Sequence, residues 1–223
     1  MLFDSIPTYN RYRTLRLLNP QQQGEDVFAL QTALNEAGFP CGEPDGILGP
    51  MTDKAIKQAQ TKYRLVVDGL AGGMTQRELA LDLAQRVSVI EHVPFNAFRG
   101  QLEHESGYRL GNYSPPREDG SYDAGVAQRN TKFTPPSQGF DCKVSIEALG
   151  AVVRKHYDLF AGINANDRRR WALAQGAWNA PAFACFIARE LGAPKVTASM
   201  TARPSASARE TFETYVTNVS AYL

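Results

Sequence analysis

The sequence predicts a mainly α-helical protein in which a small helical part is followed by a larger one. Three observations support this prediction. Apolar residues recur at helical spacing along most of the 223 residues. An Asp-Gly turn is repeated near the N-terminal end, and no stretch of any length alternates apolar and polar residues as a half-buried strand would. Hydrophobic residues make up 43% of the chain and charged residues 21%, which is typical of a folded protein with a buried core.

The repeated turn marks the N-terminal part. The stretch "DGILGPMT", which begins at Asp45, recurs as "DGLAGGMT", which begins at Asp68. An Asp-Gly pair favours a tight turn because glycine tolerates a positive φ. Each copy contains a threonine, Thr52 or Thr75, just before a helical pattern, and we expect this threonine to cap the helix. Each copy is therefore predicted to be a turn that leads into a helix.

Helical patterns surround the two turns. Before the first copy, apolar residues from Val27 to Ala37 have helical spacing, and Gly38 is expected to end that helix. A second helix between the copies is marked by Ala55, Ile56, Ala59 and Tyr63. Three short helices over about sixty residues predict a small bundle with a limited core.

The order of these residues resembles the peptidoglycan-binding domain of many cell-wall enzymes. The resemblance covers about residues 20–80, which leaves residues 1–19 as an N-terminal extension. It is carried by Val27, Leu30-Gln31, Leu34, Gly38, Asp45-Gly46-Ile47, Gly49-Pro50, Thr52, Ala55, Gln60, Leu65, Asp68-Gly69, Gly72 and Thr75. The resemblance implies that this part binds bacterial peptidoglycan, and the wall-binding residues are expected in the two turns, at Asp45, Gly46, Asp68 and Gly69. The alternative is a generic helical bundle with two Asp-Gly turns.

The second part, residues 81–223, follows without a linker rich in Pro, Gly or Ser. Its apolar spacing predicts a series of helices. Pro94 suits the first position of a helix, Ser145 is expected to cap another, and Asp167 is expected to start a third. The expected helical stretches are residues 79–93, 94–106, 145–160, 167–178 and 212–222.

The segment "LEHESG", residues 102–107, contains two glutamates that helical geometry separates. Phe95, Phe98 and Leu102 lead to Glu105 at steps of three, four and three, so Glu105 shares their face and Glu103 does not. On an apolar face, loss of hydration raises the pKa of a carboxyl, and the C-terminal end of the helix dipole acts in the same direction. A carboxyl group that keeps its proton near neutral pH can protonate a departing sugar oxygen. Glu105 is therefore a candidate general acid.

A structural role for Glu105 remains the alternative at this point. Its carboxylate would then pair with an arginine such as Arg109, or close the end of the helix. Two further motifs favour the catalytic role. They are "GVAQ", residues 125–128, and "AWNAP", residues 177–181, and both follow Glu105-Ser106 in order.

The succession Glu-Ser, Gly-x-x-Gln and Ala-aromatic-Asn-Ala-Pro resembles the catalytic domain of soluble lytic transglycosylases and goose-type lysozymes. These enzymes form glycoside hydrolase family 23 and its relatives, and the resemblance covers about residues 83–191. It implies a lysozyme-like helical catalytic domain with Glu105 as the general acid. It further implies that Ser106 orients this acid, that Gln128 lines the sugar-binding cleft, and that Asn179 is the asparagine of the third motif.

Two aromatic residues near the motifs are candidate substrate contacts. Trp178 stands where the family usually has a tyrosine, whose phenol donates a hydrogen bond to the catalytic carboxyl. An indole cannot reproduce that bond, so another residue or burial must take over its effect. Tyr122 lies in the loop that leads to Gly-x-x-Gln, and we expect it to stack on a sugar ring.

The mechanism depends on how many carboxyl groups reach the substrate. With one acid, the substrate's own N-acetyl group or C6 hydroxyl completes the reaction, and the product is the 1,6-anhydro sugar of a lytic transglycosylase. A second acid at water-holding distance allows hydrolysis with inversion; the candidates are Glu118, Asp119 and Asp123. We favour transglycosylation at the β-1,4 bond between N-acetylmuramic acid and N-acetylglucosamine. A hydrolytic muramidase and a non-catalytic wall-binding protein are the alternatives.

Other function classes have little support in the sequence. The net charge of +1 disfavours a nucleic-acid partner. The histidines, His92, His104 and His156, form no HExxH motif, so we expect no metal, no cofactor and no zinc peptidase activity. The cysteines, Cys41, Cys142 and Cys185, are odd in number and widely spaced, which predicts buried free thiols and disfavours a cysteine peptidase.

The N-terminal sequence lacks the basic start and apolar run of a signal peptide, and no later stretch is long enough to span a bilayer. We therefore expect a chain that is made in the cytoplasm without membrane insertion, and we expect it to be a monomer. A short two-domain wall-degrading enzyme of this kind resembles a bacteriophage endolysin, which reaches the periplasmic wall after release through a separate pore. Peptidoglycan is the expected partner.

Overall fold

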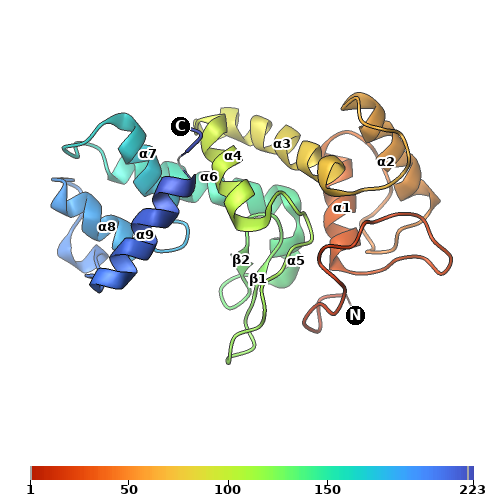
Figure 1. Ribbon diagram of the computed structural model, residues 1–223, viewed down its shortest axis with the longest axis horizontal. Coiled ribbons are helices and arrows are strands. Elements are labelled where there is room, and N and C mark those ends of the chain that lie inside the picture. The colour runs from red at the N-terminus through yellow and green to blue at the C-terminus, as the bar shows by residue number, and fades with distance from the viewer. Residues whose placement is uncertain (1, 220) are drawn as a thin grey trace. The chain divides into compact units, whose positions relative to one another are not determined.

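The computed structural model describes residues 2–219 and 221–223, and it confirms the mainly helical prediction (Figure 1). Over these residues the chain forms nine α-helices, one short 3-10 helix and one two-stranded sheet. The helices are α1 Glu25–Glu36, α2 Pro50–Lys62, α3 Gly73–Ile90, α4 Phe95–Ser106, α5 Pro136–Phe140, α6 Cys142–Leu159, α7 Asp167–Gly176, α8 Pro181–Glu190, η1 Ala198–Met200 and α9 Ala206–Val219. The strands are β1 Asp123–Ala124 and β2 Arg129–Asn130.

The chain divides into two compact units. The first unit contains Met1–Gln85 and Glu105–Ile146, and the second contains Arg86–His104 and Glu147–Leu223. Three helices, α3, α4 and α6, contribute residues to both units. The expected boundary between residues 80 and 81 falls within α3, and the division into residues 1–19, 20–80 and 81–223 stays a prediction.

The helices of the repeat region form as the apolar pattern predicts. Val27, Leu30 and Leu34 of α1 are fully buried, and α1 packs against α2. After α1, Gly38 adopts a φ of +86°, and its backbone N–H donates to the carbonyl of Asn35. This left-handed residue closes the helix end, as expected of a glycine at that position.

The predicted capping role of the two threonines is wrong. α2 begins at Pro50 and α3 begins at Gly73, so Thr52 and Thr75 lie inside the first turns of these helices. Both are buried, at 1% and 3% exposure, and their hydroxyl groups lie within hydrogen-bond distance of glutamine side chains. For α2 the physical reason is that Pro50 suits the first position of a helix, because it has no backbone N–H to satisfy.

The predicted cap at Ser145 is also wrong, because α6 begins three residues earlier. Asp141 precedes this helix, and its carboxylate accepts a hydrogen bond from the backbone N–H of Val144 at 3.0 Å. In α7, Asn166 is the cap, and it accepts from the backbone N–H of Arg169 at 2.9 Å. Asp167 is the first residue of α7, as predicted.

The N-terminal segment is tied to the rest of the first unit by polar contacts. The hydroxyl of Tyr9 donates to the carbonyl of Gly111 at 2.7 Å, and the hydroxyl of Tyr113 donates to the carbonyl of Tyr9 at 2.8 Å. The guanidinium of Arg13 forms two hydrogen bonds of 2.7 Å with the carboxylate of Asp26. A two-bond arginine–carboxylate pair fixes direction as well as distance, so this segment is an ordered part of the unit.

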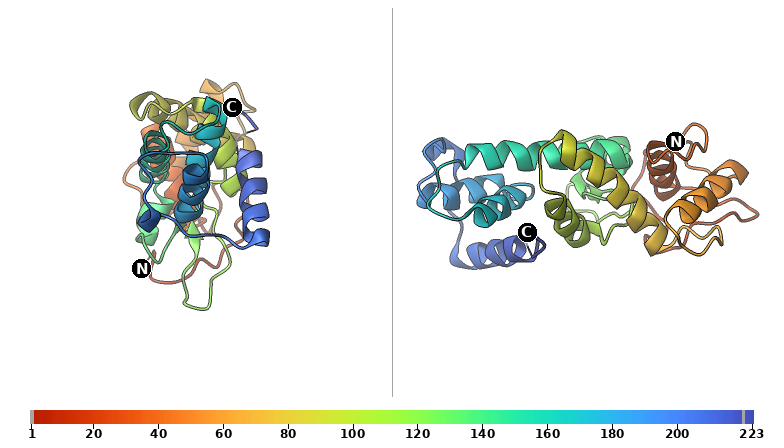
Figure 2. Two further views of the ribbon diagram at one scale, coloured as in Figure 1. Left: turned by 90° about the vertical axis from the view of Figure 1, so that its left-hand side faces the viewer. Right: turned by 90° about the horizontal axis from the view of Figure 1, so that it is seen from above.

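The second unit is built around α7, which packs against α8 and α9 (teal to blue in Figure 2). Glycines permit two close approaches in it. A Cβ atom on Gly100 would lie 2.0 Å from the carbonyl oxygen of Val219, and one on Gly176 would meet the side chains of Phe212 and Val216. A helix was expected over residues 212–222. The observed helix, α9, starts earlier, at Ala206, and ends at Val219.

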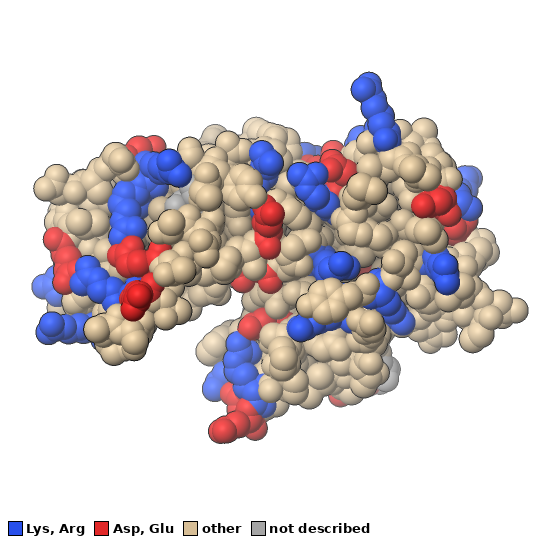
Figure 3. Space-filling model, in the orientation of Figure 1, with Lys and Arg blue, Asp and Glu red and all other residues tan. Residues whose placement is uncertain are grey.

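The surface carries charges of both signs. On the face shown in Figure 3, lysines and arginines are interspersed with aspartates and glutamates. No helix in the described part of the chain is both long and apolar enough to span a membrane.

The cysteines confirm the prediction of buried free thiols. Cys41, Cys142 and Cys185 are all free and buried. Burial raises the pKa of the Cys41 thiol to about 11, so this group stays protonated at neutral pH.

Candidate functional site

The two glutamates of the "LEHESG" segment differ in their surroundings. Phe98 and Leu102, which precede Glu105 on the same face of α4, are 2% and 0% exposed, so the apolar stripe is confirmed. Glu105 continues this stripe and is half-buried. Glu103 is exposed, and its carboxylate accepts a hydrogen bond from the hydroxyl of Tyr222. Of the two acids, only Glu105 combines partial burial with an apolar face.

The chain turns sharply after Glu105. Ser106 is the last residue of α4 and is 8% exposed. The next two residues, Gly107 and Tyr108, have φ values of +59° and +63°. Tyr108 is buried, and the guanidinium of Arg77 lies 5.4 Å from the centre of its ring. This packing fixes the end of the helix that carries Glu105, whereas the role of Ser106 in orienting the acid stays a prediction.

The Gly-x-x-Gln motif forms the turn of a β-hairpin. β1 pairs with β2 in antiparallel register, with Ala124 opposite Arg129, so residues 125–128 close the hairpin. Gly125 and Gln128 have φ values of +77° and +51°. The backbone N–H and the side-chain amide of Gln128 both donate to the carbonyl of Gly125, at 3.2 and 2.7 Å. The half-buried Gln128 therefore holds its own turn, and its contact with a sugar stays a prediction.

The first residue of the motif is a glycine for a packing reason. A Cβ atom on Gly125 would lie 1.8 Å from the carbonyl oxygen of Gly139 in α5. No side chain fits between these two backbones. Val126 and Ala127, at the centre of the motif, are fully buried. The hairpin turn is thus anchored on α5, a contact that the sequence pattern alone did not reveal.

Asp119, one of the candidate second acids, is held as a charged group. Its carboxylate accepts from the hydroxyl of Ser121 at 2.6 Å and from the backbone N–H of Ser121 at 3.1 Å. The ammonium of Lys132 lies 2.9 Å away. These hydrogen bonds hold the pKa of Asp119 well below its usual range. Asp119 is therefore a structural anion of the loop at neutral pH, and its carboxylate oxygens are already engaged by Ser121 and Lys132.

The other two candidate second acids differ from each other. Both carboxylate oxygens of Asp123 are engaged, one by Arg117 at 2.7 Å and the other by the side-chain amide of Asn130 at 3.0 Å. Asp123 thus ties its strand to the loop and to the opposite strand. Glu118 is exposed at the same loop. The catalytic roles of these acids are predictions from their position in the sequence alone. The contacts of Asp123 indicate a structural role for its carboxylate.

The aromatic and asparagine candidates lie in different units. Tyr122, in the first unit, is 4% exposed. The "AWNAP" motif forms the turn between α7 and α8 in the second unit, where Trp178 is half-buried and Asn179 is exposed. The backbone N–H of Trp178 donates to the carbonyl of Gln175 at 3.1 Å. Since Glu105 and Gln128 belong to the first unit, the cleft that would group them with Asn179 stays a prediction.

No metal site is formed in the described part of the chain, because no three His, Cys, Asp or Glu residues lie close enough to bind an ion. The half-buried His156 has its Nδ1 atom 2.8 Å from the carbonyl of Val152. Burial lowers the pKa of His156, so its ring is neutral at pH 7. His104 packs against Tyr215 with ring centres 4.7 Å apart.

A glutamine to which the sequence pattern gives no role of its own holds the first repeated turn. Gln31 is 2% exposed. Its carbonyl oxygen accepts from the backbone N–H groups of Asp45 and Gly46 at 3.1 and 2.8 Å. Its amide donates to the carboxylate of Asp45 at 2.8 Å and to the carbonyl of Ile47 at 3.1 Å. One side chain thus closes the whole turn.

Gln60 repeats this arrangement at the second turn. Its carbonyl oxygen accepts from the backbone N–H of Gly69 at 3.0 Å, and its amide donates to Asp68 at 2.8 Å and to the carbonyl of Leu70 at 3.1 Å. Gly69 has a φ of +73°, the same value as Gly46. The residues predicted to bind the wall, Asp45, Gly46, Asp68 and Gly69, therefore build the turns, and their direct contact with the wall stays a prediction. In the sequence, the signal that could have identified both glutamines is a polar residue on an otherwise apolar helix face.

Replacing either glutamine with methionine is expected to lower the free energy of unfolding by about 1–3 kcal/mol, because backbone groups of the turn lose their partner. The measurement is urea denaturation of the Gln31→Met and Gln60→Met variants. Gln21→Met, at an exposed glutamine of the same region, is the control and should change stability by less than about 0.5 kcal/mol. Equal losses in all three variants would show that the turns do not depend on the two buried amides.

A groove of about 380 Å³ lies beside the second turn. Its wall includes the apolar side chains of Val66 and Met74, which are 73% and 67% exposed, together with the carboxylate of Asp68. Exposed apolar groups around a groove commonly mark a binding surface. The sequence pattern does not indicate this surface, because Val66 and Met74 lie outside the apolar helical stripes.

Known proteins are similar to this chain in its N-terminal part. Residues 23–79 match the family model described as a putative peptidoglycan binding domain. The spore cortex-lytic enzyme of Bacillus cereus is 46% identical over 56 residues, which cover 25% of this chain and 22% of that enzyme. The spore cortex-lytic enzyme of Oceanobacillus iheyensis is 41% identical over 56 residues, 25% of this chain and 20% of that protein.

A third relative is the N-acetylmuramoyl-L-alanine amidase CwlM of Mycobacterium tuberculosis. It is 42% identical over 65 residues, which cover 29% of this chain and 16% of that protein. The aligned segments thus span only 16–22% of the length of these relatives. The family match confirms the resemblance predicted for residues 20–80, and it supports peptidoglycan as the ligand of this part of the chain.

Proposed function

We propose that the protein is a cell-wall lytic glycosidase that carries its own peptidoglycan-binding domain. The observation that supports a glycosidase most directly is the position of Glu105, half-buried at the end of the apolar face of α4. The peptidoglycan-binding match of residues 23–79 supports the bacterial wall as substrate and site of action. The bond proposed to be cleaved is the β-1,4 link from N-acetylmuramic acid to N-acetylglucosamine, as in an endolysin of the lytic transglycosylase type.

In the proposed reaction Glu105 acts first as an acid. Its carboxyl proton passes to the glycosidic oxygen as the bond from this oxygen to C1 of the muramic acid breaks. The N-acetyl group of the same sugar can stabilise the developing positive charge at C1. The C6 hydroxyl then attacks C1, and its proton returns to the carboxylate of Glu105. The enzyme ends in its starting state, and the product is a 1,6-anhydro sugar.

The contacts of the loop acids favour this one-acid route over hydrolysis. An inverting hydrolase needs a second carboxylate that is free to activate water. Asp119 is bound by Ser121 and Lys132, and Asp123 is bound by Arg117 and Asn130. A hydrolytic muramidase therefore remains the second candidate, with Glu118 as the exposed acid of the loop.

Mass spectrometry of the fragments released from purified peptidoglycan tests the proposal. The expected product is a disaccharide-peptide that ends in anhydromuramic acid. A product heavier by one water would indicate a muramidase. Free peptides beside intact glycan would indicate an amidase, the activity named for one relative. Binding of the protein to the wall with no released fragment would leave only a wall-binding protein.

The groove beside the second turn supports the binding part of the proposal. Val66, Met74 and the aspartate at position 68 present apolar surface and negative charge together. A peptide stem with methyl groups and an ammonium group has matching chemistry. We therefore propose this groove as a wall contact of the binding domain.

A further inference from the structure

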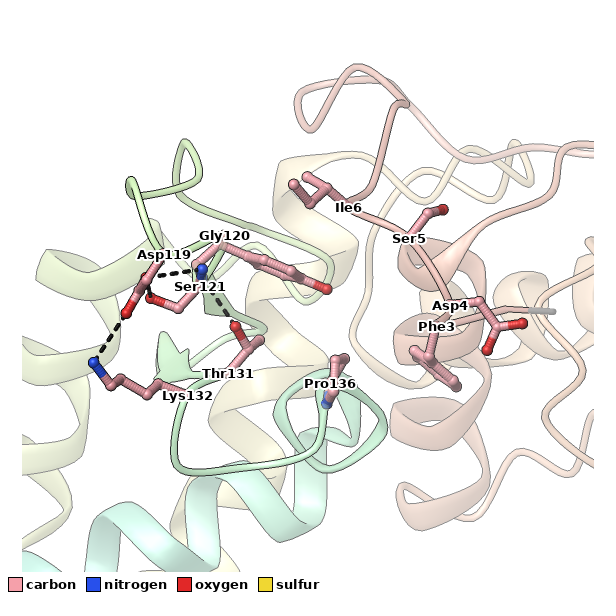
Figure 4. A pocket seen from close by; sticks show the side chains of 11 residues that line it. Phe3, Asp4, Ser5, Ile6, Asp119, Gly120, Ser121, Thr131, Lys132 and Pro136 are labelled. Carbon is pink, nitrogen blue, oxygen red and sulfur yellow. Dashed lines mark hydrogen bonds and ion pairs between the residues drawn. The ribbon is translucent and has the colours of Figure 1, made fainter.

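An open hollow of about 780 Å³ lies within the first unit, between the N-terminal segment and the hairpin loop (Figure 4). This volume is in the range of small-molecule sites, which is about 300–1,000 Å³. Residues 3–6 form one wall, and residues 119–122, 131 and 132 form the other. The first wall precedes both stretches of family resemblance, so the hollow depends on residues that neither resemblance covers.

The wall of the hollow contains a buried hydroxyl group without a partner. Tyr122 lines the hollow and is 4% exposed. Its hydroxyl oxygen is buried and forms no hydrogen bond with any residue that the structure describes. Burial and the charge of Glu25 raise the pKa of Tyr122 to about 12, so the hydroxyl keeps its proton at neutral pH. Because buried polar groups are almost always hydrogen-bonded, this donor marks a position for an acceptor on a ligand.

Apolar and hydroxyl groups make up much of the remaining surface. Phe3 lines the hollow, and its ring is held by Phe28 at 5.0 Å and by Phe140 at 6.3 Å between ring centres. The hydroxyl oxygen of Thr131 accepts from the backbone N–H of Tyr122 at 2.9 Å, which leaves its own proton for donation. Sugars present apolar ring faces together with hydroxyl and acetamido oxygens, so this surface has the chemistry that a sugar requires.

The charges around the hollow favour a neutral ligand. The ammonium of Lys132 lies 2.9 Å from the carboxylate of Asp119, so this cation is already neutralised. Asp4 adds a further carboxylate to the wall. Lys132 is the one cation among the described residues that line the hollow, so an anionic ligand would find no unpaired positive charge there, whereas a neutral oligosaccharide needs none.

We propose that this hollow binds a neutral N-acetylated oligosaccharide, with an acetamido or hydroxyl oxygen accepting from Tyr122 and a sugar ring lying against Phe3. The inference rests on the proposed function, because it takes a glycan as the substrate of the whole chain. It adds a binding site in which the N-terminal segment takes part. A glycan strand held there stays attached to the enzyme between cleavage events.

The test uses the full chain carrying Glu105→Gln, so that the oligosaccharide is not consumed. Chitotetraose, the tetramer of N-acetylglucosamine, is titrated while the backbone amide NMR signals of Ser5 and Thr131 are followed. These signals report on the hollow and not on binding elsewhere in the chain.

Tyr122→Phe removes only the hydroxyl and is expected to raise the Kd about five- to tenfold. The matched control is Tyr63→Phe, at a second tyrosine whose hydroxyl is buried in the same unit, and it should leave the Kd unchanged.

A purely structural role for the Tyr122 hydroxyl makes the opposite prediction. If it supported the fold, Tyr122→Phe would lower the thermal unfolding midpoint, whereas removal of an unpartnered hydroxyl should leave the midpoint unchanged or slightly raised. Absence of shifts at Ser5 and Thr131, or equal Kd values for Tyr122→Phe and its parent, overturns the inference. Neither result depends on Glu105. Wall lysis by Glu105→Gln would instead overturn the proposed function and leave the binding result intact.

Discussion

Glu105→Gln is expected to lower the rate of peptidoglycan cleavage by about 10²- to 10⁴-fold, which is the usual contribution of general acid catalysis. The amide has nearly the same shape as the carboxyl group but no acidic proton to give to the leaving oxygen. The rate is measured as the release of soluble fragments from purified wall. Binding of the variant to the same wall should be unchanged, because Glu105 lies outside residues 23–79.

Glu103→Gln is the matched control for this variant. Glu103 lies two residues away on the same helix, but it is exposed and accepts a hydrogen bond from Tyr222. Its replacement should leave the rate of cleavage within about twofold of the parent. Equal losses in the two variants would point to a general effect on α4 and against an acid at position 105. Full activity of Glu105→Gln would remove this residue from the mechanism.

The sequence predicted the helices well because their signal is local. Apolar spacing located α1, α2, α4 and α6, and glycine chemistry located the end of α1 at Gly38. The predicted positions of the helix starts were less accurate. Thr52, Thr75 and Ser145 are good capping residues by type, but a proline, a glycine or an upstream aspartate starts the helix in their place. Capping preference is a local property that competes with such neighbours.

The candidate site was less predictable than the helices, because its contacts join distant parts of the sequence. The pattern identified Gly125 and Gln128 as a motif, but it did not predict that they form a hairpin turn anchored on α5. The N-terminal segment had no recognisable pattern, yet Tyr9 contacts Gly111 across more than a hundred residues. Similarly, burial of Gln31 and Gln60 was visible only as a polar residue on an apolar face. Their role in holding the turns could be recognised only from the structure, which places each turn beside its glutamine.

The packing of the hairpin on α5 leads to the largest stability effect that we expect. Gly125→Ala should lower the free energy of unfolding by about 2–5 kcal/mol. A positive φ costs a residue with a side chain about 1–2 kcal/mol. The added methyl group would also overlap the carbonyl of Gly139, 1.8 Å from the ideal Cβ position, and overpacking of this kind costs about 1–3 kcal/mol. Because the backbone of Gly125 cannot withdraw without breaking its hydrogen bonds from Gln128, both contributions apply together.

Gly120→Ala separates the two contributions. Gly120 lies in the same loop region with a φ of +78°, against +77° for Gly125, but a Cβ atom there would meet nothing within 4 Å. Its replacement should therefore cost only the conformational part, about 1–2 kcal/mol, in the same urea denaturation experiment. The excess loss in Gly125→Ala then measures the contact between the hairpin and α5. If the two variants lost equal stability, the close approach to Gly139 would not exist in solution, and the glycine of the motif would be required for its φ alone.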